Sequence, residues 1–174
     1  NAHADWLSSA PFSPDGKTIV TTSGDRTARI WDTATGELLR ELSGHRDAVT
    51  SAAFSPDGET VVTASWDHTG RIWKTATGEL LRVLNGHTDS TRPAAFSPDG
   101  KTVATASRDL TARIWDIATG ETLHVLTGHT GVVASSRYSP DGRLVLTSSS
   151  DGTIRLWDAE TGELVRIIEV GAPI

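Results

Sequence analysis

The 174-residue sequence contains no cysteine and no methionine, and only one tyrosine and three phenylalanines. Without cysteine the chain forms no disulfides, holds no thiolate-bound metal and uses no cysteine nucleophile. The absence of cysteine fits a reducing compartment, and the sequence does not open with a secretory signal peptide. We therefore expect a cytoplasmic protein.

Long apolar runs and basic clusters are also missing. No stretch of 18 apolar residues occurs, so the sequence predicts no membrane-spanning helix. The formal net charge is -6 and the pI is about 5.4. Because a phosphate-binding surface needs a basic face, we expect neither nucleic acid nor a membrane as a partner.

A short motif that repeats every 42 residues organises the chain. The residues Phe54 to Gly58 read Phe-Ser-Pro-Asp-Gly, and the same letters begin at Phe12 and Phe96, and at Tyr138 with tyrosine in the first place. A fixed period of this size indicates one structural unit copied along the chain, with each copy burying its apolar faces against its neighbours. We expect residues 1–174 to form one segment with units 3–44, 45–86, 87–128 and 129–170.

Each unit is predicted to contain four short strands and no helix. In the second unit these strands cover residues 49–54, 60–65, 70–73 and 79–84, where small, β-branched and aromatic residues alternate with polar turns. Proline, aspartate and Gly58 favour a tight turn after the first strand. A small sheet that is apolar on both faces needs cover on both, and the next copy of the unit supplies it. We therefore predict an all-β fold, a β-propeller of four-stranded antiparallel blades.

The repeated letters also resemble the WD-repeat β-propeller family. The resemblance rests on Gly86-His87, Ser97 to Gly100, Asp109-x-Thr111 and Ile114-Trp115-Asp116, and it covers almost the whole chain. It implies a hydrogen-bonded structural tetrad of His, Thr, Asp and Trp in each unit. The residues implied by position are His3, Thr21, Asp25 and Trp31; His45, Thr63, Asp67 and Trp73; His87, Thr105, Asp109 and Trp115; and His129, Thr147, Asp151 and Trp157.

Two positions depart from the repeat. Lys74 stands where the other units have Asp after the Trp, which we expect to weaken the adjoining turn. Pro93 lies in the first strand of the third unit and lacks an N–H group, so we expect that strand at a sheet edge lining a central channel.

The sequence also bears on how many blades complete the ring. The facing strands are rich in Ala, Ser and Thr, and such small side chains favour many narrow blades over four wide ones. The fourth unit ends at Ile168-Glu169-Val170-Gly171, so no fifth unit begins. We expect four blades per chain, half of an eight-bladed ring that a homodimer closes with blade four of one copy against blade one of the other. The alternative is that the missing blades belong to a longer parent polypeptide.

Catalytic and ligand-binding signatures are not found. There is no Walker loop, dinucleotide fingerprint or metal motif, so we expect no cofactor and no metal, and we interpret His68 and His124 as surface residues. The His, Thr and Asp of a tetrad resemble a nucleophilic triad, which leaves a hydrolase as one alternative. Four equivalent copies favour a buried structural network, so we predict that the chain is not an enzyme.

The positions that differ between units are the candidates for binding. They concentrate on one side in the resembled family, and the residues there that most often anchor interfaces are Trp6, Trp66, Arg92 and Arg108. We predict a non-catalytic scaffold for protein–protein interactions whose rim holds an acidic or aromatic peptide. One alternative is that these are drifted surface positions. Another is an engineered or excised repeat fragment with a structural role only, which the high identity between the copies and the missing methionine favour.

Overall fold

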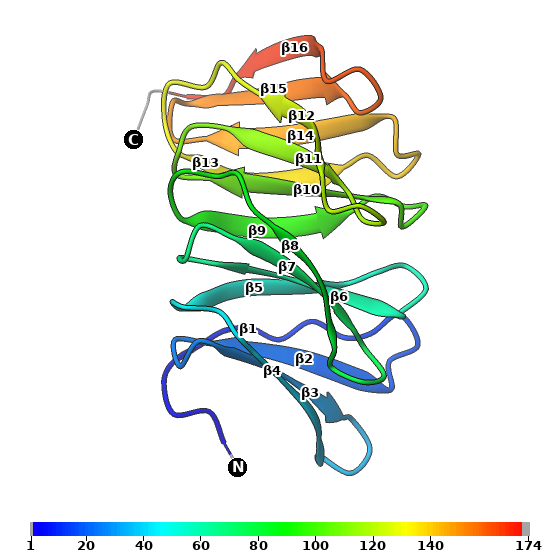
Figure 1. Ribbon diagram of the computed structural model, residues 1–174. Helices are drawn as coiled ribbons and strands as arrows, with labels where there is room; N and C mark the ends of the chain where they lie inside the picture. The colour runs from blue at the N-terminus through cyan, green and yellow to red at the C-terminus, as the bar shows by residue number, and fades with distance from the viewer. Residues whose placement is uncertain (1, 172–174) are drawn as a thin grey trace.

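The computed structural model describes residues 2–171, which form sixteen β-strands and no helix. The strands pair into four antiparallel four-stranded sheets, each built from four consecutive strands (Figure 1). We call each sheet a blade and number the blades in chain order. Blade 1 contains β1 (Leu7–Ser9), β2 (Thr18–Ser23), β3 (Thr27–Asp32) and β4 (Leu38–Ser43). Blade 2 contains β5 (Val49–Phe54), β6 (Thr60–Ser65), β7 (Gly70–Lys74) and β8 (Leu80–Leu84). Blade 3 contains β9 (Thr91–Phe96), β10 (Thr102–Ser107), β11 (Ala112–Asp116) and β12 (Thr122–Leu126). Blade 4 contains β13 (Val133–Tyr138), β14 (Leu144–Ser149), β15 (Thr153–Asp158) and β16 (Leu164–Glu169).

The all-β prediction and the four blades per chain are confirmed, and the strand ends of blade 2 differ from expectation by one residue. The strand β7 continues to Lys74, and β8 starts at Leu80. The turn between β5 and β6 closes where Gly58, at φ 73°, donates its N–H to the carbonyl of Ser55 at 2.8 Å. Glycine takes this left-handed backbone conformation at no steric cost.

The first strand of each blade is an edge strand. The strand β9, which carries Pro93, pairs only with β10, and its register with β10 shifts between Thr105 and Ser107. An edge strand has one side without ladder bonds, so the missing N–H of proline is tolerated there.

Neighbouring blades pack through two different faces. One face carries the Trp of the third strand, and the other carries aliphatic side chains of the second to fourth strands. At the first junction the aliphatic face of blade 1 meets the Trp face of blade 2 in a cluster of buried residues. The same arrangement recurs between blades 2 and 3 and between blades 3 and 4. Three equivalent apolar junctions therefore hold the chain together.

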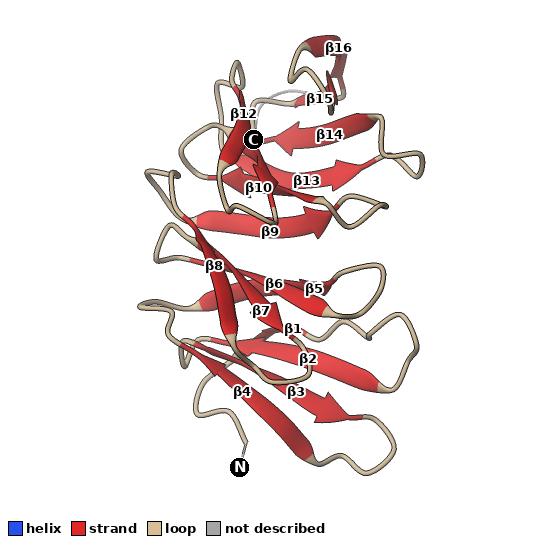
Figure 2. Cartoon of the chain, turned by 45° about the vertical axis from the view of Figure 1, so that its right-hand side comes forward, coloured by secondary structure: helices blue, strands red, loops and turns tan. Residues whose placement is uncertain are grey.

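The four blades form an open stack with the two chain ends at opposite ends (Figures 1 and 2). Blade 1 leaves its Trp face uncovered, and blade 4 leaves its aliphatic face uncovered. We call the first the N-terminal end face (Leu7, Phe12, Ile19, Trp31) and the second the C-terminal end face (Leu146, Ile154, Leu156, Ile168).

Candidate functional site

In every blade the structure brings together the four residues of the implied tetrad. In blade 2, His45 Nδ1 lies 2.8 Å from Asp67 Oδ2, and His45 Nε2 lies 2.8 Å from Thr63 Oγ1. The indole N–H of Trp73 donates to the same Thr63 hydroxyl at 2.8 Å. Equivalent bonds join His3, Thr21, Asp25 and Trp31; His87, Thr105, Asp109 and Trp115; and His129, Thr147, Asp151 and Trp157.

The aspartate of the tetrad is fully supplied with donors. Besides His45, Asp67 accepts hydrogen bonds from the hydroxyl of Thr69 at 2.6 Å, from the N–H of Thr69 at 3.0 Å and from the N–H of Arg46 at 2.9 Å. Burial alone would raise the pKa of Asp67, but the bonds from His45, Thr69 and Arg46 outweigh burial and hold its pKa well below the ordinary value. The carboxylate is therefore an ionised acceptor.

The protonation states of Asp67 and His45 determine which group donates and which accepts in each hydrogen bond of the tetrad. Burial lowers the pKa of His45 more than Asp67 raises it, so the imidazole is neutral at pH 7. Its Nδ1–H donates to the carboxylate, which leaves Nε2 as an acceptor for the Thr63 hydroxyl. Because that hydroxyl also accepts from Trp73 and the residue is fully buried, it is occupied on both sides. The geometry cross-links strands of one blade and offers no free nucleophile.

Sequence reasoning missed an arginine that stacks on the tetrad Trp in blades 2 and 3. The guanidinium of Arg71 lies 6.0 Å from the ring centroid of Trp73, and that of Arg113 lies 5.8 Å from Trp115. Gly44, before His45, lies against the Arg71 guanidinium and holds φ 142°, a backbone conformation that favours glycine. The signal was present, because all four units carry Arg at this position (Arg29, Arg71, Arg113, Arg155).

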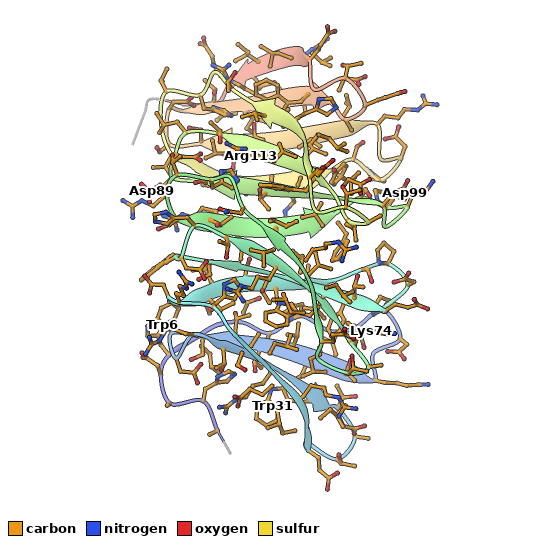
Figure 3. The ribbon with its side chains drawn as sticks, in the orientation of Figure 1. Trp6, Trp31, Lys74, Asp89, Asp99 and Arg113 are labelled. Carbon is orange, nitrogen blue, oxygen red and sulfur yellow. The ribbon has the colours of Figure 1, made fainter. Side chains whose placement is uncertain are left out.

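Two of the predicted rim residues, Trp6 and Trp66, touch each other. Figure 3 places Trp6 on the same side as Asp89, opposite Lys74 and Asp99. The rings of Trp6 and Trp66 lie 5.8 Å apart at a tilt of 48°, and the two side chains are 45% and 41% exposed. Trp6 covers Gly24, where a Cβ would approach its ring nitrogen to 2.5 Å. Trp66 stands where the other units have Gly24, Arg108 and Ser150, so its contact with Trp6 is not repeated in the other blades.

The two rim arginines belong to blade 3. Arg108 is exposed, and its charge helps the hydrogen bond from the Ser90 N–H to lower the pKa of Asp89. Arg92 is the second residue of β9, and its Nε is buried with no hydrogen-bond partner among the residues described. The structure therefore brings the two tryptophans together, and both arginines belong to blade 3.

The remaining histidines differ from each other. His68 occupies a turn position at φ 70°, whereas His124 Nε2 donates to the carbonyl of Glu160 in the next blade at 2.8 Å. No group of three His, Cys, Asp or Glu side chains within residues 2–171 is arranged to hold a metal ion. In the same range, no helix long and apolar enough to cross a membrane is found.

Comparison with known proteins decides the family. The family model described as "WD domain, G-beta repeat" matches residues 1–32, 36–74, 78–116 and 120–158. The chain belongs to the WD-repeat family. One 42-residue stretch is 55% identical to the uncharacterized WD repeat-containing protein sll1491 of Synechocystis sp.. This match covers 24% of the chain and 12% of that protein, so it extends over about one WD repeat.

Proposed function

We propose that this WD-repeat chain is a non-catalytic scaffold that closes into a ring with a second copy of itself and binds a peptide on its rim. The tetrads support the non-catalytic part, because each His, Thr and Asp is committed to hydrogen bonds inside a blade. The observation that carries the self-assembly is the contrast between the end faces and their buried counterparts.

At the N-terminal end face, Leu7 is 59% exposed, whereas Val49 at the equivalent position of blade 2 is fully buried. At the C-terminal end face, Ile168 is 40% exposed, whereas Leu126 at the equivalent position of blade 3 is 1% exposed. A soluble protein seldom leaves two such apolar sheets in water. Every internal junction pairs an aliphatic face with a Trp face. The C-terminal end face is aliphatic and the N-terminal end face carries Trp31, so the end faces of two chains can pair in the same way.

Head-to-tail pairing of these faces generates a ring when the rotation closes. Two chains of four narrow blades give eight blades, with the two-fold axis along the channel and two new junctions formed together. Light scattering at micromolar concentration is expected to give about 37 kDa, twice the 18.5 kDa of one chain. A mass of one chain across that range would contradict the ring.

The rim supports a second contact, with a peptide that carries acidic and aromatic residues. The exposed indoles of Trp6 and Trp66 present flat apolar area, and the exposed Arg108 and half-buried Arg92 of blade 3 add positive charge.

Selection from a displayed peptide library against the intact chain is the test of the rim. Enriched peptides are expected to carry acidic and aromatic residues and to lose about tenfold or more in affinity for Trp66→Ala or Arg108→Glu. Lys101→Glu is the control, because Lys101 is an exposed cation two residues after Asp99, and Asp99 lies on the opposite side of the blades from Trp6 (Figure 3). Equal binding by all three variants would remove the rim from the proposal.

The cellular location of the scaffold and the class of its partners are part of the same proposal. The lack of cysteine and the net charge of -6 support a cytoplasmic protein with protein partners, not nucleic acid or membrane partners.

A further inference from the structure

A side-chain clamp crosses each internal junction on its outer edge. Arg40 Nε on β4 donates to the carbonyl of Ala76 at 2.8 Å. One junction further on, Arg82 on β8 donates to the carbonyl of Ala118 through Nε at 2.9 Å and Nη2 at 2.6 Å. At the third junction His124 on β12 donates to the carbonyl of Glu160. In each case a residue of the fourth strand holds the last turn of the following blade.

The glycine of the receiving turn shows whether the clamp is present. A Cβ at Gly78 would lie 3.5 Å from the side chain of Arg40, and one at Gly120 would lie 3.2 Å from that of Arg82. At Gly162 the distance to the ring of His124 would be 2.7 Å. Around Gly36 in blade 1 a Cβ would meet no atom within 4 Å. The turn of blade 1 is therefore formed, but no side chain of the described residues lies against it as a clamp.

The missing clamp residue stands at the other end of the chain. Arg166 occupies on β16 the position of Arg40, Arg82 and His124, and it is exposed. The carbonyl that its equivalents would reach is that of Ala34. Ala34 already has its N–H bound to Asp32 at 2.9 Å, so the turn is held in shape.

A second contact between adjacent blades, made by the turns between the first and second strands, also lacks one partner in blade 1 and in blade 4. Pro14 lies 3.5 Å from the Cβ position of Gly58, and the pairs Pro56 with Gly100 and Pro98 with Gly142 repeat this contact at 3.6 and 3.4 Å. Gly16 of blade 1 again meets nothing within 4 Å, and Pro140 of blade 4 is exposed. Two separate contacts therefore lack their partner at the same pair of blades.

The end faces also carry more apolar volume than the internal junctions. Ile154 stands where the other blades have Ala28, Gly70 and Ala112. On the opposite face Ile19 stands where the others have valine, and it lines with Phe12, Trp31 and Gly36 a hollow of about 400 Å³. Larger side chains bury more surface when the faces meet, which an association between separate chains requires.

We propose that Arg166 of one copy clamps the Ala34 carbonyl of the second copy, and that this bond sets the register in which the two chains meet. The inference rests on the proposed ring and adds the residue that orients it. Arg166 has the side chain of two internal clamps, and the third shows that histidine also reaches the carbonyl. Each ring contains two such bonds, so the loss of Arg166 acts twice per dimer.

The test compares dimer dissociation constants of full chains by sedimentation velocity. Arg166→Ala is expected to weaken the dimer about tenfold or more, because a charge-assisted hydrogen bond is lost at both junctions. Arg166→His is expected to retain most of the affinity. Arg40→Ala is the matched control: it removes the same kind of clamp inside the chain, so it lowers the melting temperature and leaves the dimer constant within about twofold.

A further variant separates the clamp from the ring. Leu156→Glu places a charge in the centre of the C-terminal end face and is expected to give monomers with an unchanged circular dichroism spectrum. If Arg166→Ala behaves like Arg40→Ala while Leu156→Glu gives monomers, the clamp is wrong and the ring stands. If Leu156→Glu leaves the dimer intact, both proposals fall.

Discussion

Two fully buried threonines, Thr63 and Thr91, differ in whether the hydroxyl has a hydrogen-bond partner. Thr63 in its tetrad bonds to both His45 and Trp73. Thr91 is equally buried, but its Oγ1 has no hydrogen-bond partner among the described residues. The equivalent residues, Val49 and Val133, are fully buried valines. The unpaired hydroxyl therefore costs stability without serving the tetrad.

Thr91→Val is expected to stabilise the protein by about 1–2 kcal/mol, because it removes an unsatisfied hydroxyl from a site of valine shape. Urea unfolding followed by circular dichroism measures the change. The matched control is Thr50→Val, since the Thr50 hydroxyl lies 3.2 Å from the carbonyl of Ala64 and 3.3 Å from that of Thr91. That variant is expected to lose stability. A loss for Thr91→Val as well would show that its hydroxyl is paired in solution.

Acid is expected to destabilise the tetrads through both titrating groups. Burial lowers the pKa of His45, His87 and His129, so below about pH 6.5 the unfolded chain binds protons that the folded chain does not. The pKa values of Asp25, Asp67 and Asp151 are held well below ordinary, so they add a further loss near and below pH 4. The melting temperature should fall from pH 7.5 to pH 5 and more steeply below pH 4. A flat profile from pH 7.5 to 5 would show that the histidines are not buried in the neutral form.

The sequence predicted the residues of the tetrads but not the arginine that stacks on the tetrad Trp. The 42-residue period aligned His, Thr, Asp and Trp, and the resemblance assigned their roles. The stacking of Arg71 on Trp73 could not be derived in the same way, because it depends on which face of β7 each side chain takes and on the close approach of Gly44. The contact of Trp6 with Trp66 crosses two blades and needed coordinates for the same reason.

At the scale of elements, the turn between the second and third strands carries backbone strain that differs between blades. Arg26, His68 and Leu110 hold φ values of 70°, 70° and 69°, and Gly152 takes this place in blade 4. A side chain in this left-handed region costs about 1 kcal/mol. In the sequence, Gly152 indicates that this turn position takes a positive φ, but the other three units have Arg, His and Leu there and do not repeat the signal.

Leu110→Gly is therefore expected to stabilise the protein by about 0.5–1 kcal/mol, since the strain removed exceeds the entropy that glycine adds. Thermal unfolding measures the shift. Leu123→Gly is the control, because Leu123 is a comparably exposed leucine within the strand β12, so glycine there should destabilise. A lower melting temperature for Leu110→Gly would mean that the Leu110 side chain makes contacts that outweigh the strain.

The turn after the third strand explains the expected weakness at Lys74. In blade 1, Asp32 Oδ1 accepts from the N–H of Ala34 at 2.9 Å, and from the N–H and hydroxyl of Thr35 at 2.8 and 3.1 Å. Asp116 and Asp158 make the corresponding bonds to their threonines. Lysine has no acceptor to offer, so the turn of blade 2 keeps its backbone bonds, the Thr77 hydroxyl bond and the Arg40 contact but lacks the aspartate bonds of the other blades.

Lys74→Asp is expected to raise stability by about 0.5–1.5 kcal/mol through these restored turn bonds. Chemical denaturation of the variant checks the value. Lys101→Asp makes the same charge change at an exposed position that caps no such turn, so it should have little effect. Equal shifts in the two variants would assign the effect to net charge.

At the scale of the whole molecule, sequence patterns predicted the blades better than the contacts between them. Alternating small and β-branched residues with regular turns suffice for a four-stranded blade, and the strand ends in blade 2 came within one residue. The clamps could not be foreseen, because Arg40 and Ala76 lie far apart in the sequence and meet only after two blades stack. The same stacking shows that, among the described residues, no side chain lies against Gly36 while Arg166 is exposed at the other end of the stack.

The most direct measurement of the central claim is cryo-electron microscopy of the unmodified chain, since it counts blades. We predict a closed ring of eight blades with a two-fold axis along its channel and with blade 4 of each copy seated on blade 1 of the other. Particles that remain open stacks of four blades, or rings with any other number of blades, would contradict it.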